Sequence, residues 1–128
     1  MSFNYRWYKL PNNRDMAKMD VAPGLIYVVN FIKKKNGTVD CFFYPSVSSQ
    51  AMMALSDPSG SIDIQTIQEK IYQTLRNVLM DYATKYKPRA IVFSTQFQVQ
   101  LGKLSSATVP GYSTEFSSGK QSKLVKKH

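Results

Sequence analysis

One long amphipathic segment, residues 63–87, most constrains how this chain can fold. Its apolar side chains recur at spacings of three and four, as on one stripe of an α-helix. The stripe consists of Ile64, Ile67, Ile71, Leu75, Val78, Leu79, Tyr82 and Tyr86. Asp63 suits the N-cap, and Pro88 disfavours helical geometry at Lys87, so we expect a helix of about 24 residues, roughly 36 Å long. Such a stripe has to be buried against another element.

Strand patterns surround this segment. Aromatic residues alternate with polar ones over residues 3–8, and residues 25–32 and 38–44 flank Asn36-Gly37, a dipeptide typical of a type I′ hairpin turn. Residues 90–101 alternate as a long strand, whereas residues 14–22 are ambiguous and allow a short helical turn. The predicted fold class is α+β: an antiparallel sheet of three to four strands, with one long amphipathic helix packed on one face and an extended basic C-terminal tail.

The C-terminal segment, residues 102–128, differs from the rest in composition. It carries five lysines and one acid among many serines, threonines and glycines. A segment with so few apolar residues buries too little surface to offset the entropy of its own ordering. We therefore predict one α+β domain over residues 1–101 and a flexible basic tail over residues 102–128.

The charge of the chain indicates its partners. Lys and Arg total 17 against 8 acids, a formal net charge of +9, which attracts nucleic acid, anionic lipid or an acidic protein surface. The candidate contacts with nucleic acid or an acidic partner are Arg6, Trp7, Lys9, Lys33, Lys34, Lys35, Lys120, Lys123, Lys126 and Lys127. The alternative is structural: a solvated turn for the three consecutive lysines, and a core strand with basic residues at its rim for residues 5–9.

A second set of residues suits contacts between subunits. The predicted strand over residues 90–101 carries no charge between Ile91 and Leu101, so it lacks the usual protection of an edge strand. Its glutamine row either faces solvent or pairs with another chain, and two aromatic residues of the tail offer apolar anchors. The candidate assembly residues are Gln96, Gln98, Gln100, Tyr112 and Phe116.

Catalytic and metal-binding patterns are missing from the sequence. The one histidine, His128, is the last residue, and the one cysteine, Cys41, lies mid-strand on an apolar face, which suits a buried inert thiol. We therefore expect no enzyme activity, cofactor, metal or small-molecule substrate. The longest apolar run, residues 25–29, is too short to span a membrane, and the N-terminus shows no signal-peptide core. We expect a protein of the host cytoplasm or a virion, not secreted by a signal peptide.

Residues 67–95 carry one resemblance. A helix that ends at Lys87-Pro88, followed by the strand sequence of residues 90–94, resembles a helix–strand unit of small uncharacterised phage-encoded proteins, some of which are similar to fragments of the GNAT acetyltransferase fold. The resemblance implies a phage origin. An acetyltransferase would also carry a glycine-rich pyrophosphate loop before the helix, but residues 57–61 read Asp-Pro-Ser-Gly-Ser, with a single glycine. This departure weakens the enzyme interpretation.

Three hypotheses follow. The first is a non-enzymatic phage or viral structural or assembly protein that packs with other subunits and contacts nucleic acid or acidic partner surfaces through its tail. The second is a free nucleic-acid-binding or host-inhibiting protein. The third is a GNAT-like acyltransferase.

Overall fold

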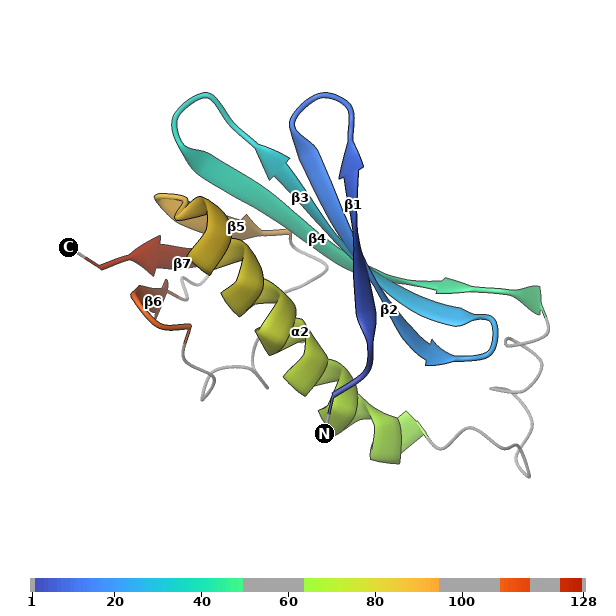
Figure 1. Cartoon of the computed structure of the whole chain (residues 1–128). Helices are drawn as coiled ribbons and strands as arrows, with labels where there is room; N and C mark the ends of the chain where they lie inside the picture. The colour runs from blue at the N-terminus through green and yellow to red at the C-terminus, as the bar shows by residue number, and fades with distance from the viewer. Residues whose placement is uncertain (1, 50–63, 95–108, 116–122, 128) are drawn as a thin grey trace.

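The computed structural model describes residues 2–49, 64–94, 109–115 and 123–127, which form a mixed seven-stranded sheet with a long helix against one face (Figure 1). The strands are β1 (Tyr5–Leu10), β2 (Arg14–Ala22), β3 (Leu25–Lys33), β4 (Thr38–Val47), β5 (Ala90–Phe93), β6 (Tyr112–Glu115) and β7 (Lys123–Lys126), and the helix is α2 (Ile64–Tyr86). The sheet order is β1-β2-β3-β4-β5-β7-β6. The prediction of a three- to four-stranded antiparallel sheet was therefore wrong.

The first four strands form an antiparallel meander joined by tight turns. Asn12 and Asn13 adopt φ angles of 64° and 58°, a left-handed conformation that asparagine tolerates better than most residues. The β3–β4 turn differs from the predicted type I′ form, because only Gly37, at φ 86°, is left-handed there. The Gly37 amide donates to the Lys34 carbonyl and the Lys34 amide to the Thr38 carbonyl, so the turn is a longer loop that ends in a left-handed glycine.

Strand β2 accounts for part of the error in strand number. Residues 14–22 are weak strand formers, yet Asp15, Ala17 and Met19 alternate inward and are buried. Pairing with β1 on one side and β3 on the other satisfies the backbone of this segment. Tertiary pairing thus overrides the local preference for a helical turn.

Helix α2 confirms the predicted apolar stripe and connects β4 to β5. Leu75 and Val78 are fully buried, and burial of each such side chain contributes roughly 1.5–3 kcal/mol. Lys87 leaves the helix at φ 48°, directly before Pro88. Because the helix runs back along the sheet, β5 lies parallel to β4, with Thr38 opposite Ala90 and Cys41 opposite Phe93.

The last two strands lie within residues 102–128, which the sequence predicted to be an extended tail. Strand β7 pairs antiparallel with β5, and β6 pairs antiparallel with β7. Three apolar residues of this region enter the core: Val109, Tyr112 and Leu124. Tyr112 donates its hydroxyl to the Pro88 carbonyl at 2.6 Å, a buried bond that ties β6 to the end of the helix. The described parts of this segment therefore form two strands of the same sheet.

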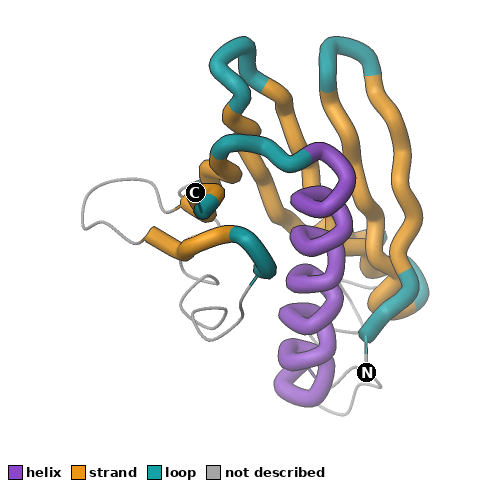
Figure 2. The backbone as a smooth tube through the Cα atoms, turned by 60° about the vertical axis from the view of Figure 1, so that its left-hand side comes forward, coloured by secondary structure: helices purple, strands orange, loops and turns teal. Residues whose placement is uncertain are grey.

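The core lies between α2 and the face of the sheet that the helix crosses (Figure 2). Its centre is aromatic: the rings of Phe31 and Tyr82 stack with centroids 4.0 Å apart. The opposite face of the sheet carries Tyr8, Phe42 and Tyr44, each more than one third exposed. One face of the sheet therefore packs against the helix, and the other carries exposed aromatic rings.

We expect Tyr112→Phe to lower the free energy of unfolding by about 1–3 kcal/mol, because it leaves the buried Pro88 carbonyl without its donor. Urea denaturation measures the change. Tyr44→Phe, which removes the same atom from an exposed ring, is the matched control and should stay within about 0.5 kcal/mol of the parent. Equal stability of the two variants would contradict the assigned hydrogen bond.

Candidate functional site

Segments that are far apart in the sequence meet at one end of the molecule. The β3–β4 turn, the C-terminal end of α2, the start of β5 and the end of β7 lie together there (Figures 1 and 2). Backbone hydrogen bonds join them in a row: the Arg89 amide donates to the Gly37 carbonyl, and the Lys126 amide donates to the Arg89 carbonyl, both at 3.0 Å. This region is called the basic end below, because each of these segments brings cations to it.

A cavity of about 310 Å³ opens at the basic end. Its lining includes Lys33, Lys34, Lys87 and Arg89, and none of the described residues that line it is an acid. Like charges repel one another when no counter-charge lies among them, so such a group favours an anion. The cavity therefore has the electrostatics of a phosphate- or carboxylate-binding site.

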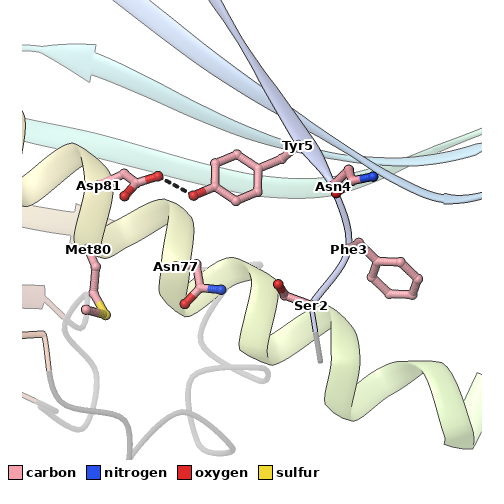
Figure 3. A pocket seen from close by; sticks show the side chains of 7 residues that line it. All are labelled: Ser2, Phe3, Asn4, Tyr5, Asn77, Met80 and Asp81. Carbon is pink, nitrogen blue, oxygen red and sulfur yellow. Dashed lines mark hydrogen bonds between the residues drawn. The ribbon is translucent and has the colours of Figure 1, made fainter.

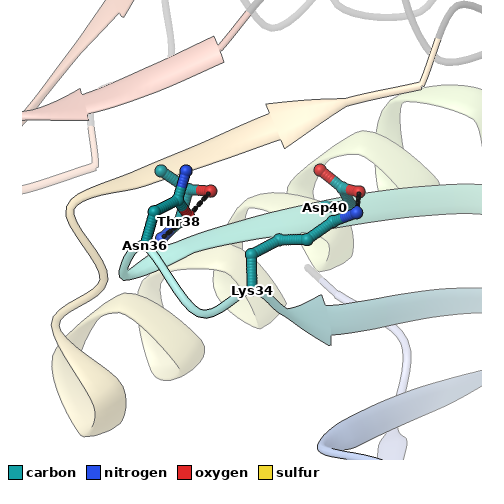
Figure 4. A network of polar contacts seen from close by, with 4 residues as sticks. All are labelled: Lys34, Asn36, Thr38 and Asp40. Carbon is teal, nitrogen blue, oxygen red and sulfur yellow. Dashed lines mark hydrogen bonds and ion pairs between the residues drawn. The ribbon is translucent and has the colours of Figure 1, made fainter.

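Nearby acids neutralise part of this charge. Lys34 pairs with Asp40 at 3.1 Å across the base of the turn, where the Asn36 side chain also accepts hydrogen bonds from Thr38 (Figure 4). Lys33 lies 3.8 Å from Asp15, which is buried beneath it. Asp40 alternates with the buried residues Val39 and Cys41, so the Lys34 pair lies toward the open face of the sheet. Lys33 lies on the helix side, with its ammonium 3.9 Å from the centre of the Tyr86 ring.

Arg89 is held in place by the turn itself. Its aliphatic stem crosses Gly37, where a Cβ atom would lie 3.0 Å from Arg89 Cδ, and its guanidinium donates to the Asn36 carbonyl at 3.4 Å. The left-handed φ angle at position 37 therefore favours glycine, and a Cβ atom there would also require the Arg89 side chain to shift by a few tenths of an ångström.

Several predicted contact residues gather at the basic end, together with two that the sequence hypothesis left out. Lys33, Lys34 and Lys35 reach it from the β3–β4 turn, and Lys126 and Lys127 reach it from the end of β7. These two, Lys87 and Arg89, were not among the predicted contact residues. The Lys-Pro-Arg sequence directly after a helix was the available signal, but its proximity to the distant turn depends on the parallel β4–β5 pairing.

The other predicted residues are dispersed. Arg6 pairs with Asp20 at 3.2 Å, and its guanidinium lies 5.9 Å from the centre of the Tyr8 ring. Lys123 lies 3.8 Å from Glu115 on the neighbouring strand. Tyr112 is buried in the core of its own chain. The remaining candidates lie outside the described residues: Gln96, Gln98, Gln100, Phe116 and Lys120.

Trp7 and Lys9 lie on β1 beside the last two turns of α2, where they line a cavity of about 540 Å³. Next to it, a second hollow of about 510 Å³ lies between the N-terminal residues and the helix (Figure 3). Met80 and Asp81 belong to the lining of both, and the Tyr5 hydroxyl donates a hydrogen bond to Asp81 where they adjoin. The Trp7 cavity adjoins the basic end as well, since Tyr82 and Tyr86 line both of those cavities.

The described residues give little support for a reactive cysteine or a metal site. Burial raises the pKa of the Cys41 thiol well above its usual value, and the adjacent Asp40 charge adds to this, so the thiol stays protonated. Within the described ranges, no three His, Cys, Asp or Glu side chains lie close enough together to hold a metal ion.

None of the helical segments described here combines the length and hydrophobicity that a membrane crossing requires.

In comparisons with known proteins, no protein-family model matches the chain, and no curated protein or solved structure matches it significantly.

We expect the stability contributed by Tyr5 to fall at high pH. Burial, followed by the hydrogen bond to Asp81 and the charge of that carboxylate, raises the pKa of Tyr5 from 10.0 to about 12. Between these values the unfolded chain loses the proton first, so the folded state binds more protons and the free energy of unfolding decreases as pH rises. The difference in stability between the parent and Tyr5→Phe should therefore shrink from pH 10 to pH 12.

Urea denaturation of both proteins across this range measures that difference, and the comparison cancels the titration of the other tyrosines and lysines. Asp81→Asn is the second variant, because it removes the charge and keeps an acceptor; in that background the difference should depend less on pH. A difference that stays constant up to pH 12 would contradict the assigned environment of Tyr5.

Proposed function

We propose that this chain is a non-enzymatic binding protein that holds nucleic acid through the phosphates at its basic end. The observation that carries the proposal is the cavity lined by Lys33, Lys34, Lys87 and Arg89, with no acid among its described lining residues. Lysine and arginine side chains on neighbouring backbone segments suit the regularly spaced charges of a phosphodiester chain. Lys126 extends the same row on β7.

Part of the charge at this end of the molecule has a structural role. Lys85 lies in the last turn of α2 and Lys87 directly follows the helix, where cations stabilise the helix dipole. That role does not extend to Lys33, Lys34, Arg89 or Lys126, which come from strands and turns. Lys33 and Lys34 are paired with Asp15 and Asp40, so the excess rests mainly on the cations at the start of β5 and the end of β7, and this excess favours a polyanion as the partner.

A role in a phage or viral assembly stays a prediction. The net charge of +9 and the exposed aromatic residues Tyr8, Phe42 and Tyr44 are compatible with a chain that contacts both nucleic acid and neighbouring subunits. Co-purification with particles is the observation that bears on it.

We expect Lys87→Ala combined with Arg89→Ala to weaken binding of a single-stranded oligonucleotide and to flatten its salt dependence. Each phosphate contact that is lost lowers the slope of log K against log salt concentration by about 0.7 for single strands. Fluorescence anisotropy of a labelled oligonucleotide at several salt concentrations measures both effects.

The matched control is Lys70→Ala combined with Arg76→Ala, which removes the same charge from α2 at a distance from the basic end. If nucleic acid binds at the basic end, this control should change the slope of log K against log salt concentration less than the Lys87/Arg89 variant does. Equal effects of the two double variants would indicate that net charge alone attracts the strand. Poly-glutamate in place of the oligonucleotide tests the acidic-protein alternative, and tighter binding to it would overturn the proposal.

A second candidate, an acyltransferase-like activity, has one observation in its favour. The helix–strand unit that carries the sequence resemblance is formed by α2 and β5, and β5 lies parallel to β4. The carboxyl ends of parallel strands, next to the start of the connecting helix, are a common place for phosphate-bearing cofactors. Residues 50–63, which lead into the helix, lie outside the described residues.

A ligand that binds the folded chain raises its melting temperature, so the acyltransferase candidate requires acetyl-CoA to do so. Since acetyl-CoA is itself an anion, ATP is the control for charge. Stabilisation by acetyl-CoA that exceeds that by ATP, and that survives Lys87→Ala with Arg89→Ala, would favour this candidate. Equal shifts with the two compounds would remove its support.

A further inference from the structure

The cavity beside Trp7 has a chemistry that phosphate binding alone does not use. Its volume is about 540 Å³, and it lies between β1 and the last turns of α2. Aromatic residues form much of its lining, with Trp7, Tyr82 and Tyr86 among them. Lys9 and Lys85 supply cations, and Asp15 and Asp81 supply carboxylates. A flat aromatic ligand with a polar edge matches such a lining better than a phosphate does.

The rings around this cavity are already arranged for stacking. Trp7 stacks on Phe31 with centroids 5.9 Å apart and lies 6.3 Å from the Tyr82 ring, and Tyr82 in turn stacks on Phe31. Trp7 is 39% exposed, so much of its surface is available to a further ring. A large aromatic ring that packs on the core on one side and meets solvent on the other suits base stacking.

Tyr82 adds an independent observation. The residue is 1% exposed and lines both this cavity and the basic cavity, yet its hydroxyl has no hydrogen-bond partner among the residues that the structure describes. A buried polar group without a partner costs free energy and calls for an explanation. A ligand that carries hydrogen-bonding groups and enters beside Tyr82 would supply the partner.

We infer that the Trp7 cavity binds a nucleobase, which stacks on Trp7 and bonds through its polar edge to Tyr82 and Asp15. The inference rests on the proposed function and deepens it: phosphates lie at the basic end, and one base enters the adjoining cavity. The shared lining by Tyr82 and Tyr86 makes the two sites neighbours. The polar edge of a base offers the N–H groups that a carboxylate accepts.

Two sources supply the same base, a nucleic-acid strand and a free nucleotide, and the experiment separates them. Trp7 is the only tryptophan of the chain, so its fluorescence reports on this cavity alone. The full chain is titrated with three probes: a short oligodeoxycytidylate, an abasic phosphodiester of equal length and charge, and cytidine monophosphate. Fluorescence anisotropy of the labelled strands measures binding separately from Trp7 quenching.

The expected result is that both strands bind and that only the base-bearing strand quenches Trp7. Quenching by cytidine monophosphate at similar concentrations would assign the cavity to a free nucleotide. Failure of both strands to bind would overturn the proposed function. Binding of both strands without quenching would leave that function intact and overturn the nucleobase site.

Two variants test the contacts. Trp7→Ala should weaken the base-bearing strand by about 5- to 150-fold and leave the abasic strand unchanged, whereas Trp7→Phe should retain most of the affinity. Tyr44→Ala, an exposed ring on the opposite face, is the matched control. If affinity for the base-bearing strand fell in Tyr44→Ala and not in Trp7→Ala, the base would stack on the open face of the sheet and the inference would be overturned.

Tyr82→Phe separates binding from folding. It keeps the ring that stacks on Phe31 and removes the unpartnered hydroxyl, so the free protein should be at least as stable as the parent. Affinity for the base-bearing strand should nevertheless fall several-fold, with no change for the abasic strand. Unchanged affinity for both strands would show that the hydroxyl does not contact the base.

Discussion

The rest of the structure depends on the burial of one stripe of α2 against one face of the sheet. Leu75, Val78 and Tyr82 are fully buried there, and Tyr82 stacks on Phe31 of β3. Because the helix has to run back along the sheet to bury this stripe, the strand that follows it enters parallel to β4. Lys87 and Arg89 then lie beside the distant β3–β4 turn, and the packing of the core thereby creates the basic end.

The helix was predictable because its signals are local and repeated. An apolar residue recurs at every turn, and Pro88 marks the end of the helix. These local signals are enough to predict the helix without knowledge of its tertiary contacts. Strand β2 was not predictable in this way, since Met16, Ala17 and Lys18 favour a helix locally and only pairing with both neighbours makes the segment extended. Strands β6 and β7 are four residues each, and their composition resembles that of an unstructured segment. Their burial follows from Tyr112 and Leu124, which the sequence presented as isolated apolar residues.

The candidate site was predictable in its charge and not in its geometry. The three consecutive lysines at positions 33–35 are evident in the sequence. Their proximity to Arg89 and Lys126 could be predicted only by knowing the order of β4, β5 and β7 in the sheet. The interleaved residues of β1 were predicted as candidate contacts, with no face of the sheet assigned to each. Strand geometry directs Trp7 toward the helix side and Arg6 and Tyr8 away from it.

In the binding mode that we propose, the two neighbouring cavities contribute interactions with different physical behaviour. Cations at the basic end act through long-range attraction, which salt weakens and which is insensitive to the identity of the bases. Trp7 and Tyr82 act through contact, which salt affects little and which requires a base. If only the first part operated, affinity would vanish at high salt and the aromatic cavity would have no role in binding. The buried, unpartnered hydroxyl of Tyr82 argues against this simpler arrangement, because a cavity needed only for packing would be better lined by phenylalanine at that position.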